Sequence, residues 1–411
     1  MKKLKILYLC HRIPYPPNKG DKIRSFHQVR FLAEQADIDL ITLADDPADL
    51  AHRTALAKMC RRVAVFPLNR LSATLRGGWQ LLRGRSISQG YFYHPDFEQT
   101  VDEWTSSESY HAIVCFSSPM AGYVMKKTGE IPSSTRLIMD FCDLDSDKWL
   151  QYSRKSPFPM SAVYRVEGRR LLAFEKQVSK AFLHSLFVSA AEAELFKKVF
   201  PGAGGVSVVP NGVDFDYFDP SRVTAVETKN RPMLMFSGAM DYYANVEGVC
   251  WFAREILPGI RRKFPGAGFC IVGSNPDPRV TALAREPGVT VTGFVDDIRQ
   301  YYKSADICVV PLGIARGVQN KVLEAMSMEK AVVSTSVAIQ GNRAVSGRDL
   351  VVADGAEEFS DAVIDLLNNR PEAERYGIAA RGYVREHHDW QRILERSYLP
   401  LFFNDQRRKF Q

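Results

Sequence analysis

The chain lacks several features that would place it in a specialised class of protein. None of its seven cysteines forms a Cys-x-x-Cys pair, and most lie in apolar runs typical of strands. We therefore expect reduced thiols in a cytoplasm, with neither a structural zinc site nor a disulfide framework. No stretch of 18 uninterrupted apolar residues occurs, so no transmembrane helix is expected. The apolar run at the start ends at Cys10, which is too short for a signal peptide and favours a first strand.

Acidic residues are absent between positions 50 and 95, whereas eight basic residues occur there: Arg53, Lys58, Arg61, Arg62, Arg70, Arg76, Arg83 and Arg85. Residues 1–210 hold 29 Lys and Arg against 21 Asp and Glu, a balance of +8, which leaves 25 against 26, or −1, for residues 211–411. The net charge of +7 thus belongs to the first half. Because the basic stretch has no recognition motif, we do not expect nucleic-acid binding.

Within this basic stretch, four large apolar residues fall on one helical stripe: Leu71, Leu75, Trp79 and Leu82. Gly77 and Gly78 disfavour a helix there. Two interpretations remain open. A basic amphipathic helix is attracted to an anionic membrane surface, whereas an ordinary surface helix docks its apolar stripe on the core.

What is present is a regular alternation of strands and helices over 411 residues, a length that suits two domains. The first half predicts strands at Lys5–Cys10, Ile38–Leu43, Arg62–Phe66, Ala112–Phe116, Arg136–Phe141 and Ser185–Val188. The second half predicts strands at Met233–Ser237, Phe269–Val272, Val289–Thr292, Asp306–Pro311, Ala331–Thr335 and Leu350–Val352. This alternation predicts an α/β protein with two doubly wound parallel sheets. We place the domains at residues 1–210 and 211–388, with the C-terminal helix 389–411 completing the first.

The segment 306–335 is the most informative, because it reads as strand, loop, helix and strand. Its loop lies at the carboxyl end of a parallel strand, where open α/β sheets bind ligands. The loop supplies anion-binding groups, namely Arg316, Gly317 and the N–H groups of Val318, Gln319 and Asn320, with Lys321 in the first helical turn. Glu324 follows one turn later, so an ion pair with Lys321 on a solvated helix face is the other interpretation.

Two further clusters occur in the first half. Gly20 precedes a helix that carries Lys22 and Arg24 in its first turn, where cations oppose the helix dipole. Either an anion docks there or the charges are solvated. Asp143 and Asp145 follow a strand. They do not begin an EF-hand calcium loop, because Lys148 and Arg154 stand where that loop requires Gly and Glu. Three uses of these aspartates remain open, namely a divalent-metal site, helix capping and polar contacts with a ligand. Of these, we do not expect the metal site. Ser189 and Glu192 predict a capping box.

Six landmarks follow one another in an order that resembles the retaining family 4 glycosyltransferases of the GT-B fold. They are VVPNGVDFDYF, MFSGAM, FCIVGS, VTVTGFVDDIRQYYKSADICVVPL, NKVLEAM and AVVST. The first half also resembles a narrower group, the sugar transferases associated with the exosortase A/PEP-CTERM system. The segments that carry this resemblance are PYPPNKGDKIRSFHQVRFL, MDFCDLDSDKW and RRLLAFEKQVSKAF. The resemblance implies two Rossmann-like domains, a nucleotide diphosphate sugar as co-substrate in the cleft between them, and no cofactor.

What the resemblance implies can be placed on single residues. Glu324 matches the glutamate that grips the ribose hydroxyls, and Lys321 with the N–H groups of Val318–Asn320 holds the diphosphate. The glycines Gly238, Gly273 and Gly317 and the backbone at Phe294 and Val295 line the donor site, while Gly20 lets the first-domain loop approach the phosphates. Lys22, Arg24, Asp143 and Asp145 are then expected on the acceptor side.

The chain departs from the family pattern at two places. Arg316 stands where the family often has a glutamate eight residues before Glu324, and no cation follows Gly238. Arg316 is expected to supply the missing charge. The sequence thus predicts a cytoplasmic retaining hexosyltransferase with a glycan or lipid-linked acceptor related to exopolysaccharide. Its basic stretch suggests a peripheral position on the inner face of the membrane. A nucleotide-sugar epimerase of the same fold and a non-catalytic nucleotide-sugar-binding protein are the alternatives.

Overall fold

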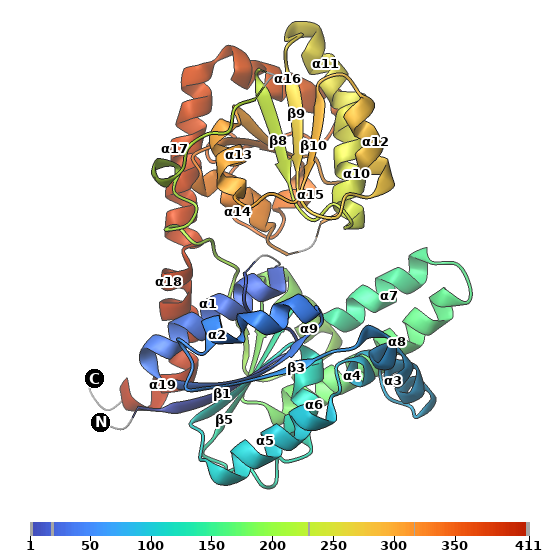
Figure 1. The fold of residues 1–411 in the computed structure, drawn as a ribbon, viewed down its shortest axis with the longest axis vertical. Coiled ribbons are helices and arrows are strands. Elements are labelled where there is room, and N and C mark those ends of the chain that lie inside the picture. Colours follow the sequence, from blue (N-terminus) through green and yellow to red (C-terminus); the bar gives the residue numbers. More distant parts are fainter. Residues whose placement is uncertain (1–2, 18–19, 229–230, 316, 408–411) are drawn as a thin grey trace. The chain divides into compact units, whose positions relative to one another are not determined.

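The structure is a computed structural model that describes residues 3–17, 20–228, 231–315 and 317–407, with side chains described up to Phe403. The chain forms two compact units (Figure 1). Unit 1 comprises Met1–Pro210 and Leu394–Gln411, and unit 2 comprises Asn211–Ile393. The predicted α/β architecture with two parallel sheets is confirmed.

Unit 1 is built on a seven-stranded parallel sheet with the strand order β3-β2-β1-β4-β5-β6-β7. Its strands are β1 (Lys5–Cys10), β2 (Asp37–Ala44), β3 (Arg62–Pro67), β4 (Ala112–Phe116), β5 (Arg136–Cys142), β6 (His184–Phe187) and β7 (Val206–Val208). Its helices are α1 (Gly20–Gln35), α2 (Arg53–Leu56), α3 (Arg70–Leu82), α4 (Ile87–Tyr91), α5 (Pro95–Ser107), α6 (Ala121–Met125), α7 (Asp145–Lys155), α8 (Met160–Ala181), α9 (Ala190–Val199) and α19 (Pro400–Arg407).

Unit 2 is built on a six-stranded parallel sheet with the order β10-β9-β8-β11-β12-β13. Its strands are β8 (Met233–Ser237), β9 (Gly268–Val272), β10 (Val289–Gly293), β11 (Ile307–Val310), β12 (Ala331–Ser334) and β13 (Val351–Val352). Its helices are α10 (Tyr243–Trp251), α11 (Leu257–Lys263), α12 (Pro278–Ala282), α13 (Ile298–Ser304), α14 (Asn320–Ser327), α15 (Ser336–Ile339), α16 (Ala356–Asn368), α17 (Arg370–His387) and α18 (Trp390–Ile393).

The central strands of both sheets are buried on both faces, which is why they read as continuous apolar runs. In each sheet the strand order reverses direction once, between β1 and β4 in unit 1 and between β8 and β11 in unit 2. A crevice opens at such a switch point, at the carboxyl ends of the strands, and ligands of doubly wound proteins bind there.

One buried ion pair organises the centre of unit 1. Arg24 on α1 donates from Nε and Nη2 to the two carboxylate oxygens of Asp140 on β5, at 3.0 and 3.2 Å. Its Nη1 donates to the carbonyl of Val209 at 2.7 Å, and Gln28 donates to Asp140 at 2.6 Å. Asp140 holds the pKa of Arg24 above its ordinary value despite burial, which would lower it.

The C-terminal segment returns to unit 1 after leaving unit 2 at Ile393. The Tyr398 hydroxyl donates to Gln28 at 3.3 Å, and the His111 ring lies 2.6 Å from the carbonyl of Phe402. The start of the last described helix, α19, therefore lies against the beginnings of β4 and β5, since Arg136 also donates to the carbonyl of Leu401 at 3.3 Å.

Some elements differ from their predicted bounds, each for a local reason. The strand β7 was not predicted, because three residues are too few for a pattern. The expected helix Asn245–Phe264 contains a π-helical turn at Phe252–Ile256, since Pro258 has no N–H to continue the ladder. Ser189 caps α9 as predicted, but Glu192 does not complete the box, because its carboxylate accepts from the N–H of Leu144 instead.

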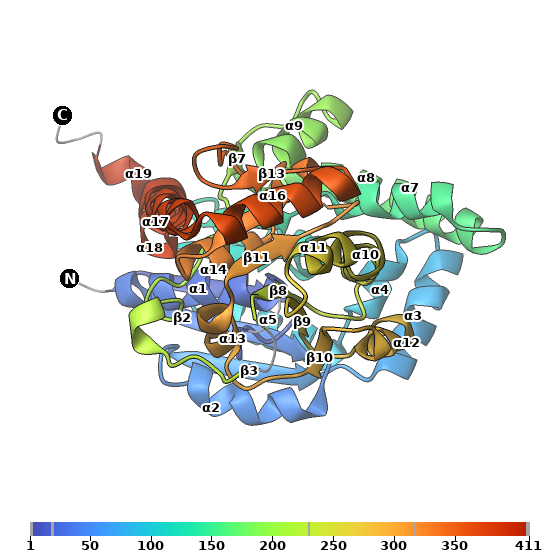
Figure 2. The ribbon, with the colours of Figure 1, turned by 90° about the horizontal axis from the view of Figure 1, so that it is seen from above.

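Two helices of unit 1 form a long hairpin. In Figures 1 and 2, α7 and α8 run side by side and extend away from the sheet. The inner part of α8 holds α4, because Glu167 accepts hydrogen bonds from the N–H groups of Ile87 and Ser88 at 2.5 and 3.0 Å.

Candidate functional site

The switch point of unit 2 brings together the residues that the sequence singled out. The strand β8 leads into a loop at Gly238, and the neighbouring strand β11 leads through residues 311–319 into α14. Lys321 and Glu324 lie on α14, one turn apart and both partly buried. Arg316 lies outside the described residues.

Lys321 is held by polar and aromatic contacts rather than by a carboxylate. Its Nζ donates to Oδ1 of Asn245 at 2.5 Å and lies 4.6 Å from the centre of the Phe236 ring. Among the described residues, no carboxylate lies within ion-pair distance of it. The predicted alternative of a solvated ion pair with Glu324 is therefore wrong.

The electrostatics of Lys321 follow from this environment. Burial lowers the pKa of Lys321 to about 7, and the nearby negative charge of Glu324 opposes that shift only in part. A buried ammonium without a paired anion is costly, so a bound diphosphate would supply the missing charge.

Glu324 is positioned by a second set of hydrogen bonds. Its Oε2 accepts from the hydroxyl of Tyr302 at 3.0 Å, and that hydroxyl lies 2.6 Å from the Ser237 hydroxyl. Burial raises the pKa of Glu324, whereas the Tyr302 hydrogen bond and Lys321 lower it. The carboxylate is thus oriented by a buried tyrosine, and its other oxygen remains available to accept a hydroxyl.

Two glycines form the floor beside Lys321. A Cβ on Gly238 would lie 2.7 Å from Nδ2 of Asn245 and 3.2 Å from Nζ of Lys321. A Cβ on Gly273 would lie 1.7 Å from the carbonyl oxygen of Gly238. A side chain at either position would clash with these groups and push the two loops apart. Glycine at both positions therefore lets the two loops pack closely beside Lys321, so that backbone groups line the switch point there.

The end of β10 lies beside these glycines. The N–H of Gly273 donates to the carbonyl of Gly293 at 3.2 Å. Phe294 follows directly and is 70% exposed, while Val295 packs partly against the core. The Phe294 ring is thus exposed at the carboxyl end of an edge strand, whereas the sequence led us to expect that the backbone at Phe294 and Val295 lines the donor site.

The start of α14 carries the remaining predicted groups. Gly317 adopts a left-handed φ of 59°, and its carbonyl lies where a side chain on Gly341 would be. Val318 is buried and Gln319 is the N-cap residue. Asn320 has a buried side-chain oxygen without a hydrogen-bond partner. Asn320 stands next to Lys321 in the first turn of α14, and its oxygen can accept a hydrogen bond from a ligand.

Lys22 and Arg24 have a different role from the predicted one. The Lys22 Nζ donates to Asp49 at 2.6 Å, and Arg24 pairs with Asp140, with both cations nearly fully buried. The expectation that an anion docks on them is corrected, because carboxylates of the fold already compensate their charges. Asp21 supplies the acidic residue that the first turn of α1 needs, and Gly20 is the exposed first residue of that helix.

Asp143 lies just after β5 and has a buried Oδ1 without a partner. Burial, and then the charges of Glu192 and Asp145, raise the pKa of Asp143 to about 6. Asp145 is more exposed and begins α7, 3.8 Å from Lys148. The two predicted acidic residues thus differ in burial and in hydrogen bonding, and Asp143 is the one suited to contact a ligand.

Two residues that the sequence did not suggest share the property of Asp143. His11 follows β1 and has a buried Nδ1 without a partner, while its Nε2 lies 3.4 Å from Asp21. Ser118 follows β4 and has a buried hydroxyl without a partner. Because β1, β4 and β5 are neighbours, the three unpartnered groups come from adjacent strand ends at the switch point of unit 1.

Other residues could not be found from the sequence either. Asn245 and Tyr302 position Lys321 and Glu324, but neither stands in a local sequence pattern that marks a binding residue. Their roles depend on contacts across 76 and 22 positions of the chain.

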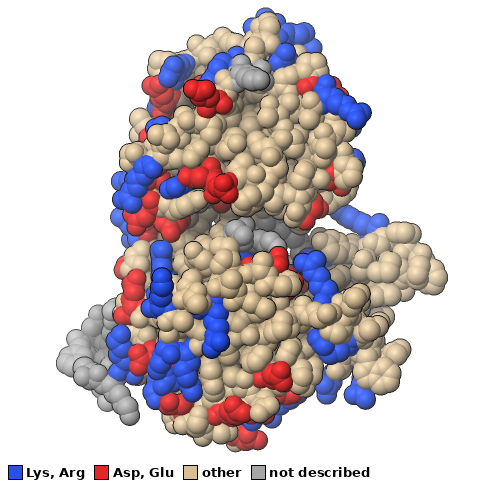
Figure 3. Space-filling model, in the orientation of Figure 1, with Lys and Arg blue, Asp and Glu red and all other residues tan. Residues whose placement is uncertain are grey.

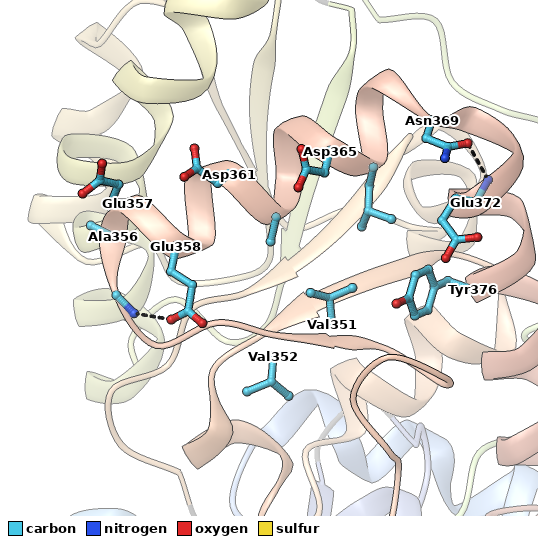
Figure 4. Close-up of a pocket in the computed structure, with 13 residues that line it drawn as sticks. Val351, Val352, Ala356, Glu357, Glu358, Asp361, Asp365, Asn369, Glu372 and Tyr376 are labelled. Atoms are coloured by element: carbon cyan, nitrogen blue, oxygen red, sulfur yellow. Dashed lines mark hydrogen bonds between the residues drawn. The ribbon is translucent and has the colours of Figure 1, made fainter.

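A groove of about 880 Å³ elsewhere on unit 2 shares no residue with this site. Figure 4 shows that α16 presents Glu357, Glu358, Asp361 and Asp365 along it, and Glu372 lies at the far end. No Lys or Arg lines it. An acidic groove repels a nucleotide diphosphate, so it is not the donor site. Within the described ranges, no three His, Cys, Asp or Glu residues are arranged to hold a metal ion.

Comparison with known proteins relates part of the chain to a family. Residues 231–369 match the family described as "Glycosyl transferases group 1". This part of the chain is similar to the group 1 glycosyl transferases. It includes Gly238, Gly273, Lys321 and Glu324.

The curated relatives of this chain are distant. A Klebsiella pneumoniae protein named "Uncharacterized 44.6 kDa protein in cps region" is 20% identical over 95% of the chain and 98% of its own length. A GDP-mannose-dependent alpha-(1-6)-phosphatidylinositol monomannoside mannosyltransferase of Mycobacterium tuberculosis is 27% identical over 50% of the chain and 58% of its own length.

Solved structures resemble the chain over nearly its full length. Sucrose-phosphate synthase from Thermosynechococcus elongatus has a TM-score of 0.68 at 16% identity, covering 99% of both chains. The Anabaena protein Alr3699/HepE in complex with UDP-glucose has a TM-score of 0.66 at 15% identity, covering 95% of this chain and 97% of that one. These likenesses show the GT-B fold, as predicted.

Proposed function

We propose that the protein transfers a hexosyl group from a nucleotide diphosphate sugar to a hydroxyl group of a glycan or lipid-linked acceptor, with retention at the anomeric carbon. The observation that carries this proposal is the partly buried Lys321, which no carboxylate in the described chain neutralises and which lies beside Gly238 at the switch point. The group 1 match and the likeness to a structure with bound UDP-glucose support a nucleotide-sugar donor.

The reaction needs stabilisation of the leaving group more than it needs a nucleophile. When the bond between the anomeric carbon and the donor oxygen breaks, negative charge develops on the nucleotide diphosphate. Lys321 and the N-terminal N–H groups of α14 stabilise that charge. Glu324, oriented by Tyr302, accepts hydrogen bonds from the ribose hydroxyls and fixes the donor. The leaving phosphate then takes the proton of the attacking hydroxyl.

The acceptor is proposed to contact the switch point of unit 1. There Asp143, His11 and Ser118 present three unsatisfied polar atoms that can bind hydroxyl groups. A carboxyl with a pKa near 6 accepts a hydrogen bond from a hydroxyl once ionised. An acceptor rich in hydroxyls, such as a glycan related to exopolysaccharide, suits this set of groups. The narrower resemblance of the first half to transferases of the PEP-CTERM system also supports such an acceptor.

Thermal stabilisation by a panel of nucleotide sugars tests the donor assignment. A ligand that binds the native state at 100 times its Kd raises the free energy of unfolding by about 2.7 kcal/mol. We expect at least one nucleotide sugar to raise the Tm of the natural chain. Lys321→Ala and Glu324→Gln are expected to abolish that shift. Lys303→Ala, which removes an exposed lysine of the same unit, is the matched control and should keep it.

The same samples separate the alternatives. Transfer to an acceptor that requires Lys321, with loss of turnover in Asp143→Asn, supports the proposal. Free sugar isomer formed without acceptor would indicate an epimerase. Donor binding without any turnover in the natural chain would indicate a binding protein. No stabilisation by any nucleotide sugar would overturn the assignment of the site.

A further inference from the structure

An apolar stripe lies exposed on α3 of unit 1. Leu71, Leu75, Trp79 and Leu82 are 80%, 75%, 55% and 79% exposed. We call these four residues the α3 stripe. Since consecutive members are three or four positions apart, they lie on one side of the helix. Folded monomers rarely leave several large apolar side chains together in water, so such a patch marks an interaction surface.

The helix already has a different buried face. Ala73 and Gly77 lie on the opposite side of α3 and are buried. A Cβ on Gly77 would lie 2.8 Å from the Ile87 side chain of α4, so the missing side chain lets the two helices touch. The sequence-based alternative, in which the leucine stripe docks on the core, is therefore wrong. Gly77 weakens the helix by propensity but permits this packing.

The stripe belongs to a firmly attached helix. Asn69 caps its start by accepting from the N–H groups of Leu71 and Ser72 at 3.0 and 3.2 Å. At its end, the Arg170 guanidinium of α8 donates to the carbonyl groups of Leu81 and Arg85. The exposed face is thus presented in a fixed orientation, and its exposure is not that of a fraying end.

Basic residues surround the stripe. Arg70 precedes it and Arg83 and Arg85 follow it, and all three are exposed. Within the described part of the chain, none of the three forms an ion pair with a carboxylate. The Arg83 guanidinium lies 5.0 Å from the Trp79 ring. In Figure 3 the region of α3, at lower right, is largely tan with blue atoms beside it.

We infer that the α3 stripe binds the surface of an anionic lipid bilayer, with the leucines and Trp79 inserted among the acyl chains and the arginines against the headgroups. Apolar residues flanked by cations are what such a surface attracts. A second copy of this chain fits less well, because pairing two copies would bring their arginines together. No helix in the described ranges is long and apolar enough to cross a bilayer, so attachment would be to one face.

Vesicle flotation tests this inference without donor or acceptor, so its outcome does not depend on the proposed function. The natural chain is mixed with vesicles of phosphatidylcholine, or of phosphatidylcholine with about 30% phosphatidylglycerol. We expect binding that is at least roughly tenfold tighter to the anionic vesicles and that weakens with salt.

Three variants test which side chains are responsible for the vesicle binding. Leu71→Ser with Leu75→Ser and Leu82→Ser should lose binding roughly tenfold or more, because the insertion is removed. Arg70→Gln with Arg83→Gln and Arg85→Gln should lose the preference for anionic vesicles. Val345→Ser with Ile378→Ser removes exposed apolar side chains of unit 2 and should bind as the natural chain does. Circular dichroism and Tm confirm that each variant is folded.

Trp79 reports the contact directly. Of the five tryptophans, it is the one in the exposed class of side chains. Brominated lipids should quench fluorescence in the natural chain and lose most of that quenching in Trp79→Phe. Equal binding by the leucine variant, or no binding by the natural chain, would overturn the inference. A dimer in solution that only the leucine variant disrupts, without vesicle binding, would assign the stripe to self-association instead.

Discussion

Lys321 is the residue whose chemistry depends most on what surrounds it. It sits at the start of a helix, where a cation opposes the dipole, and its contacts are an amide oxygen and an aromatic ring. The helix start is unfavourable for an isolated ammonium, whereas the amide oxygen and the ring stabilise it. Burial still lowers the pKa of Lys321 to about 7, so the lysine is about half protonated at pH 7 before a ligand binds.

Proton uptake on donor binding follows from this state. At pH 8 a lysine with a pKa of about 7 is mostly neutral, and a bound diphosphate raises its pKa and draws in a proton. Calorimetry with a nucleotide sugar in buffers of different ionisation enthalpy should show uptake near one proton at pH 8 and near zero at pH 6. Because the proton must be taken up, donor affinity should fall as the pH rises above 7.

Lys321→Arg provides the control, since a guanidinium stays charged across this range. It should bind the donor with no uptake at pH 8. Uptake that persists in Lys321→Arg would assign the titrating group elsewhere.

The sequence could predict Lys321 and Glu324 but not their supports. The two residues stand in a strand–loop–helix pattern that supplies anion-binding groups, although that pattern alone also fits a surface ion pair, and the landmarks on both sides favour the binding site. Asn245, Tyr302, His11 and Ser118 carry no such local pattern, and only the fold brings them to strand ends. Lys22 and Arg24 are the opposite case. Two cations in a first helical turn suggested a binding site, but the structure explains their position by pairing them with Asp49 and Asp140.

Elements set the precision of the site, and α14 shows how. Its eight residues follow a loop whose glycines let it pack closely on Gly341. Strand positions were predicted well, because a buried parallel strand reads as an apolar run bounded by turn residues. Helix ends were predicted less well, since they depend on caps and on single contacts such as that of Glu192 with Leu144.

The helix α1 is predicted to depend on its buried ion pair. Arg24→Met leaves Asp140 charged in the core, and Asp140→Asn leaves Arg24 without its partner. Breaking a buried pair from one side costs about 3–5 kcal/mol of the free energy of unfolding. Each single variant should therefore unfold at clearly lower urea concentration.

A double-mutant cycle identifies the cause. Arg24→Met combined with Asp140→Asn should lose less stability than the two single losses added together. Additive losses would show that the two side chains act independently and would contradict the pairing.

The whole molecule divides its tasks between two units of similar architecture and different charge. The basic surplus lies in the first half, which carries the α3 stripe, while unit 2 holds the donor-site residues and an acidic groove. The α/β class and both sheets could be predicted, because alternation along the chain is a global pattern. The exposure of the α3 stripe could not, since the same pattern fits either burial or exposure.

The seven cysteines are all free, and six of them are buried. Four lie in unit 1 and three in unit 2. Burial also raises the pKa of every one of these thiols, so the reactive thiolate is scarce in the folded chain. A thiol reagent can therefore modify a cysteine only after local opening of the fold. The labelling rate of each cysteine then measures how often its own unit opens.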